Sequence, residues 1–107
     1  LGDVYKRQMS PEKLIKFNSY YLDKSKREIY TEQQIQISVT SKEFDIILYF
    51  LTHPSVAISR DQLLTDIWGE SYYGYYRVVD NHVKNIRRKL PNFHLETIYG
   101  FGYRCIL

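Results

Sequence analysis

The chain has 107 residues, of which 44% are hydrophobic and 25% are charged, and its formal net charge is +3. That length fits one ordinary folded domain and leaves no room for a second, since domains usually need about 100–200 residues. Cys105 is the single cysteine, which excludes an intramolecular disulfide framework and fits a reducing compartment, so we expect a cytoplasmic protein. The longest apolar run, Ile46–Leu51, is far too short to span a membrane.

The N-terminal third of the chain has a strand-like pattern. Residues 1–12 have no sustained apolar period, and we interpret them as a linker or a non-native remnant before a domain of residues 13–107. Short apolar runs broken by turn-forming residues then predict four strands, at Leu14–Phe17, Tyr20–Leu22, Arg27–Tyr30 and Gln34–Val39. In the last run Ile35, Ile37 and Val39 alternate with polar residues, which predicts one buried side of a small antiparallel meander.

Two helices are predicted from capping signals. Thr40–Glu43 has the form of a capping box, and its helix should run to about His53, where a proline follows. The apolar residues of this helix fall on two sides, so we expect it to lie between the sheet and the remaining helices. Ser59–Gln62 repeats the capping pattern and begins a short helix that Trp68 and Gly69 close, with Trp68 expected in the core.

A loop, a third helix and a hairpin complete the predicted order. Residues 70–76 form a loop that contains four tyrosines, and the third helix runs from about Arg77 to Leu90. Leu95–Tyr99 and Tyr103–Leu107 are strand-like and are joined across Gly100-Phe101-Gly102, where glycine makes a tight turn possible.

The third helix separates apolar from basic residues. At the helical period its apolar residues cluster on one narrow arc, which must face the core: Val79, Val83, Ile86 and Leu90. The opposite arc holds three cations and two carboxamides and no acid: Arg77, Asn81, Lys84, Asn85 and Arg88. Asp80 and Arg87 share one flank, and we predict that they form a structural pair. Residues 77–107 contain six Lys/Arg and two Asp/Glu, so the basic surplus lies in this last third of the chain.

This composition suits a helix that enters the major groove of DNA. Cations neutralise phosphates and release counterions, whereas Asn and Arg side chains can form bidentate hydrogen bonds with base edges. Two short helices before a longer basic helix make a helix-turn-helix, and the hairpin after it makes a wing. The alternative is a winged-helix protein-interaction module that acts through the tyrosine-rich loop 68–76. DNA binding should weaken steeply with salt, whereas a tyrosine surface should respond much less.

Seven motifs, in order and at the expected spacing, resemble the OmpR/PhoB-type winged-helix effector domain of bacterial two-component response regulators. Together they cover the chain from Leu14 to Leu107. They are Thr40–Asp45, Ser59–Leu64, Ile67–Gly69, Arg77–Asp80, His82-Val83, Ile86–Leu90 and Gly100–Arg104.

The resemblance implies an α+β fold with a four-stranded N-terminal antiparallel sheet, a three-helix core and a C-terminal hairpin. It places helix 77–90 in the major groove and wing 95–107 on the flanking backbone. Base-facing positions are Asn81 and Asn85, with Lys84 and Arg88 beside them on the same arc. Positions near the DNA backbone are Arg77, His82, Arg87 and Arg104. The implied contact with RNA polymerase falls on Glu70, Tyr72, Tyr73, Tyr75 and Tyr76.

The resemblance also implies partners beyond the chain itself. These are a receiver domain before residue 1, its sensor kinase, and a second copy on tandem direct-repeat half-sites, the isolated domain being monomeric in solution. One departure from the family concerns Tyr99, where many members have an arginine that can enter a narrow minor groove. Tyrosine cannot supply that charge, and Arg104 is a weaker substitute.

Other chemistries find little support in the sequence. The three histidines and Cys105 match no compact metal motif, so we expect no metal and no cofactor. No nucleophile with a matching base and no phosphate loop is present, so we expect no enzymatic activity. Cys105 lies in an apolar strand and is interpreted as a small core residue.

Overall fold

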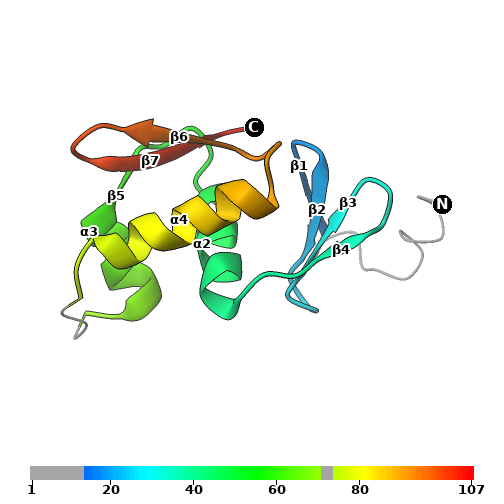
Figure 1. Ribbon diagram of the computed structural model, residues 1–107, viewed down its shortest axis with the longest axis horizontal. Coiled ribbons are helices and arrows are strands. Elements are labelled where there is room, and N and C mark those ends of the chain that lie inside the picture. Colours follow the sequence, from blue (N-terminus) through cyan, green and yellow to red (C-terminus); the bar gives the residue numbers. More distant parts are fainter. Residues whose placement is uncertain (1–13, 71–73) are drawn as a thin grey trace.

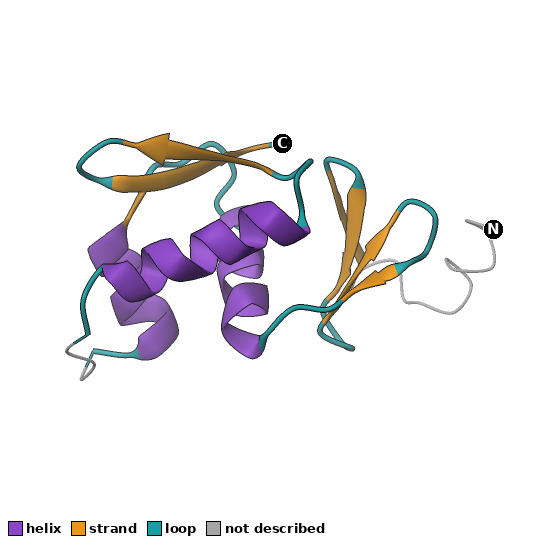
Figure 2. Ribbon diagram, in the orientation of Figure 1, coloured by secondary structure: helices purple, strands orange, loops and turns teal. Residues whose placement is uncertain are grey.

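The computed structural model describes residues 14–70 and 74–107, which form two small sheets around three helical segments. The predicted linker 1–12, together with Tyr72 and Tyr73, lies outside the described residues. The first sheet has the order β1-β2-β3-β4, with β1 at Leu14–Phe17, β2 at Tyr20–Asp23, β3 at Glu28–Thr31 and β4 at Gln36–Ile37. The later elements are α2 (Ser41–Leu51), β5 (Ile58–Ser59), α3 (Arg60–Leu63), η2 (Leu64–Trp68), α4 (Arg77–Lys89), β6 (His94–Ile98) and β7 (Gly102–Ile106). Figures 1 and 2 show the four-stranded sheet at one end and the helices under the hairpin at the other.

The N-terminal sheet is antiparallel throughout, as the sequence predicts, and its inner face closes one side of the core. The predicted burial in the fourth strand is wrong at one position, because Ile35 is 64% exposed. The turn between β3 and β4 extends to Ile35, whose carbonyl accepts a hydrogen bond from Thr31 N at 2.9 Å. Gln34 adopts a φ of 67° within this turn, and the strand β4 begins only at Gln36.

Helix α2 begins at the predicted capping box. Thr40 Oγ1 accepts from Glu43 N at 3.2 Å, and Thr40 N donates to Glu43 Oε1 at 2.9 Å. Side chains from two sides of this helix are buried, in agreement with its expected position between the sheet and α3 (Figure 1). None of the helices in the described part of the chain has the length and apolar character needed to cross a membrane.

The second helical segment is less regular than predicted. Ser59 Oγ caps α3 by accepting from Gln62 N at 3.0 Å, but after four residues the chain continues as the π-helical turn η2. Gly69 ends η2 with a φ of 107°. The apolar arc predicted for α4 is confirmed, since Val79, Val83, Ile86 and Leu90 are at most 1% exposed.

The C-terminal hairpin belongs to a three-stranded sheet of order β5-β7-β6, of which the sequence pattern does not predict β5. Only two residues form β5, too few to give a periodic pattern. Their pairing with β7 requires close backbone approach at Gly102. A Cβ atom on Gly102 would lie 2.0 Å from Ile58 O, so no other residue fits there without backbone movement.

We predict that Gly102→Ala lowers the free energy of unfolding by about 1–3 kcal/mol, because the methyl group must displace β5. Urea denaturation followed by circular dichroism measures the loss. The matched control is Gly100→Asn, since Gly100 has a φ of 70° but no atom near its missing Cβ, and Asn tolerates that conformation. An equal loss in both variants would contradict a close-packing requirement that is specific to position 102.

Candidate nucleic-acid interface

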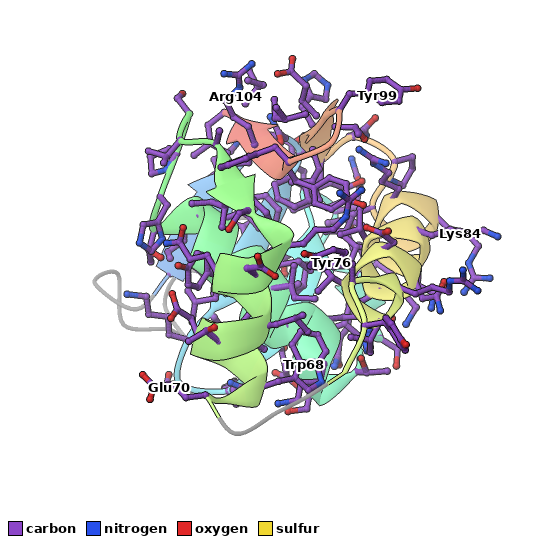
Figure 3. The ribbon with its side chains drawn as sticks, turned by 90° about the vertical axis from the view of Figure 1, so that its left-hand side faces the viewer. Trp68, Glu70, Tyr76, Lys84, Tyr99 and Arg104 are labelled. Carbon is purple, nitrogen blue, oxygen red and sulfur yellow. The ribbon has the colours of Figure 1, made fainter. Side chains whose placement is uncertain are left out.

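The outward arc of α4, formed by Arg77, Asn81, Lys84, Asn85 and Arg88, is accessible to a ligand. Four of these side chains are exposed and Asn85 is half-buried. Within residues 14–70 and 74–107, none of the five side chains has a hydrogen-bond or ion-pair partner. Lys84 points away from the body of the molecule (Figure 3). The fold therefore leaves three cations and two carboxamides available on one side of a rigid helix.

Two other cations of α4 have structural partners instead. Lys89 Nζ lies 2.6 Å from Oε1 of Glu43, whose side chain is almost completely buried, and so joins the end of α4 to the start of α2. Arg87 donates to Leu95 O and to Thr97 Oγ1 at 2.8 Å, which joins α4 to β6. A phosphate contact by Arg87 would therefore compete with its hydrogen bonds to β6.

The predicted pair between Asp80 and Arg87 is wrong. Asp80 Oδ1 instead accepts from Arg60 Nε at 2.8 Å and from Tyr103 Oη at 2.5 Å. Two helical turns separate positions 80 and 87, a rise of roughly 10 Å, which is too far for direct pairing along one helix face. Two guanidinium groups lie over the ring of Tyr103, at 5.6 Å (Arg60) and 5.5 Å (Arg87) from its centroid.

The contacts of Asp80 and Glu43 lower the pKa of both carboxyl groups. Burial alone would raise the pKa of Asp80, but the hydrogen bonds from Arg60 and Tyr103 outweigh it, and the pKa lies below its ordinary value. Glu43 behaves in the same way, with Lys89 and the backbone of Thr40 as its donors. Both groups are therefore ionised at neutral pH, and their charges hold α4 in place.

The wing has a fixed tip. Phe101 N donates to Ile98 O at 3.0 Å across the turn, and Phe101 O accepts from Arg60 N at 3.1 Å at the start of α3. Arg104 bonds to Glu96 on the neighbouring strand and points away from the side on which Lys84 lies (Figure 3). A backbone contact by Arg104 would therefore compete with Glu96 and require DNA to reach the far side of the hairpin.

Trp68 at the end of η2 belongs to an aromatic cluster, and exposed residues follow it before α4. Trp68, predicted to be core, is half-buried and packs against the core, with Lys42 Nζ 5.3 Å above its ring and His82 at its edge. His82 Nδ1 lies 2.7 Å from Val78 O, so one ring nitrogen is committed to the helix backbone. Of the predicted polymerase-contact residues that are described, Glu70 is exposed, and Tyr75 and Tyr76 are 87% and 51% exposed.

Two further features concern metal-ligating side chains and the cysteine. No group of three or more metal-ligating side chains occurs among them. Cys105 is buried, its Sγ lies 3.1 Å from Phe50 O, and burial raises the pKa of its thiol, as expected for a core residue.

A helix-turn-helix whose second helix presents unpaired cations and carboxamides, followed by a hairpin wing, defines a winged-helix DNA-binding domain. A family model described as "Transcriptional regulatory protein, C terminal" matches residues 22–105. The chain belongs to this family, the OmpR/PhoB-type DNA-binding effector domains of response regulators. It is a family of transcription-factor domains and not of enzymes.

Individual relatives agree with this assignment. The chain is 45% identical over 104 residues to the transcriptional regulatory protein CssR of Bacillus subtilis, covering 96% of this chain and 46% of that protein. The crystal structure of the CssR DNA-binding domain superposes with a TM-score of 0.80 at 46% identity, covering 82% of this chain and all of that one. The DNA-binding domain of Klebsiella pneumoniae RstA, solved in complex with the RstA box, gives a TM-score of 0.77 at 26% identity, covering 88% and 97%. The chain spans about half the length of the curated relatives it matches.

We predict that Asp80→Asn lowers the free energy of unfolding at pH 7 by about 1–2 kcal/mol, because Arg60 loses its ionic partner in a half-exposed position. The pKa of Asp80 is lower in the folded chain than in the unfolded one, so its stabilisation is present above about pH 4 and disappears as the pH falls through the folded pKa. The variant should therefore lose less stability than the unchanged chain on acidification. Urea titrations from pH 7 to pH 3 measure both effects.

The matched control for this experiment is Asp61→Asn, which removes an exposed carboxylate of α3 that has no ion-pair partner among the described residues. A similar loss in this control would contradict a specific role for Asp80.

Proposed function

We propose that the chain binds double-stranded DNA sequence-specifically, with α4 in the major groove and the hairpin on the flanking backbone. The observation that carries this proposal is the separation of charges on α4. Arg87 and Lys89 bind within the fold, whereas Arg77, Lys84 and Arg88 have no partner among the described residues. Unpaired cations supply affinity for phosphates, and Asn81 and Asn85 beside them can read adenine. Action on DNA would take place in the cytoplasm of a bacterium.

The likeness to RstA supports DNA binding, because that domain was solved in complex with the RstA box and shares the fold. A purely protein-binding role through residues 68–76 is less favoured, since it would leave the basic arc without a function. The exposed Glu70, Tyr75 and Tyr76 fit a second surface that contacts RNA polymerase while α4 stays on DNA. In a longer protein a receiver domain, controlled by a sensor kinase, would regulate this binding.

One α4 helix reads only a few base pairs, so a single copy has limited specificity. We infer that two copies occupy neighbouring half-sites arranged as a direct repeat, as the family resemblance implies. The apolar arc of α4 is buried in the core, so this helix offers no second apolar face for a dimer in solution. Pairing would then arise on DNA, where adjacent sites raise the local concentration.

We predict that Lys84→Ala and Arg88→Ala weaken binding to all duplexes and make the plot of log K against log salt shallower by about 0.9 each. Asn85→Ala should instead relax the preference at one base position and leave nonspecific affinity unchanged. Selection from random duplex DNA supplies the probe, and fluorescence anisotropy at several salt concentrations measures the slopes. Unchanged slopes and unchanged base preference in all three variants would remove α4 from the interface.

We predict that two copies bind a duplex with two direct half-sites and one copy binds a single half-site, while the free domain sediments as a monomer. Analytical ultracentrifugation with and without the three duplexes (single, direct and inverted) measures the stoichiometry. A stable dimer without DNA, or tighter pairing on inverted half-sites, would contradict the direct-repeat arrangement.

A further inference from the structure

The turn between β1 and β2 holds the open end of the C-terminal hairpin. Asn18 lies in this turn, and its carboxamide reaches both strands of the hairpin. Its Oδ1 accepts from His94 N at 3.2 Å, and its Nδ2 donates to Ile106 O at 3.4 Å. His94 and Ile106 face each other as the first pair of the β6–β7 ladder. One side chain of the N-terminal sheet therefore bridges β6 and β7 at the end opposite the wing tip (Figure 1).

The backbone of Asn18 has a conformation that few residue types adopt. Its φ of 47° lies in the left-handed region, which asparagine tolerates better than most residues with a side chain. Glycine would adopt the same conformation without strain, but it has no carboxamide. The turn by itself therefore does not require asparagine, and the two hydrogen bonds to the hairpin supply a reason for it.

Contacts beside Asn18 fix the same turn to the connection between α4 and β6. Tyr20 Oη accepts from Asn92 N at 3.0 Å, and the rings of Phe17 and Phe93 meet edge to face with their centroids 5.2 Å apart. All three of these rings are at most 4% exposed. The turn is thus anchored in the core, so a shift of the open end of the hairpin must break its bonds to Asn18.

Other contacts hold the hairpin closer to its tip. Phe101 O accepts from Arg60 N at 3.1 Å, and Gly102 packs against β5. Arg87 of α4 bonds to β6 between the two ends. The pair bonded to Asn18 lies four residues further along the strands than the pair at Gly102, a distance of roughly 14 Å. Without Asn18 the open end could therefore swing about the contacts with α4 and β5, and the paired strands would turn together.

Resting on the proposed function, we propose that Asn18 is a positioning residue for DNA binding. It sets the angle of the hairpin relative to α4 and so aligns the hairpin with the backbone that flanks the α4 site. Asn18 acts through the hairpin, because its carboxamide is engaged by His94 and Ile106. A hairpin that is free at its open end would have to be ordered on binding, and that cost would offset part of its contact with DNA. A residue of the N-terminal sheet thereby contributes to an interface formed by the last third of the chain.

The test uses Asn18→Gly, which permits the positive φ and removes the carboxamide. The matched control is Gln34→Gly in the β3–β4 turn of the same sheet, where φ is 67° and no hydrogen bond among the described residues reaches the hairpin. Fluorescence anisotropy on the selected duplex measures affinity at several salt concentrations. We expect Asn18→Gly to bind about three- to tenfold more weakly, with the salt slope unchanged because no charge is removed. Gln34→Gly should bind like the unchanged chain.

Hydroxyl-radical footprinting separates positioning from a general loss of stability. Each variant is measured at a concentration that saturates the duplex and at a temperature at which circular dichroism shows it folded. Asn18→Gly should keep the protection of sugars across the α4 site and lose much of the protection in the flank that the hairpin contacts. A variant that is only less stable would lose both protections together, since the unfolded chain makes neither contact.

The outcomes distinguish this proposal from the function on which it rests. If the unchanged chain protects both regions and Asn18→Gly matches it in affinity and footprint, Asn18 does not position the hairpin while DNA binding stands. A loss that is equal in both regions, a shallower salt slope, or an equal loss in Gln34→Gly would overturn the proposal in the same way. If the unchanged chain binds no duplex selectively, both proposals are overturned.

Discussion

The carboxylate of Asp80 joins three elements on which the DNA-binding half of the molecule depends. It lies on α4, accepts a hydrogen bond from Arg60 at the start of α3, and accepts another from Tyr103 on β7. Arg60 in turn donates its backbone N–H to Phe101 at the tip of the wing. A recognition helix and a wing can read DNA together only if their spacing is fixed, because a shift of about 1 Å breaks hydrogen bonds to base edges. The acid within an otherwise basic helix thus has a structural reason.

The cations of α4 fall into two groups, those that contact other elements of the fold and those that point outward. Lys89 and Arg87 anchor the C-terminal half of the helix, one to the buried Glu43 of α2 and the other to β6. The buried carboxylate of Glu43 would be costly to leave unpaired near the core. The cations that remain point outward, where water solvates them until a polyanion replaces it. Net charge alone does not distinguish these two groups.

The sequence predicted most of the elements because their signals are local. The capping box at Thr40, the apolar arc of α4 and the glycine-turned hairpin each require only neighbouring residues to be recognised. The predictions were wrong or incomplete where the local sequence pattern does not determine the structure. Ile35 fits the alternating pattern of a strand, but it lies in a turn in which Gln34 adopts a positive φ. The two residues of β5 form a strand only because β7 lies beside them.

The candidate site shows the same division. The sequence by itself determined which residues share the outward arc of α4, since a period of 3.6 fixes that arc whatever surrounds the helix. It also determined that no acid lies on that arc. Only the tertiary structure decided which charges are free, because Arg60 and Asp80 are 20 positions apart and Glu43 and Lys89 are 46 apart. Pairs at that separation form through packing of whole elements, and no local pattern encodes them.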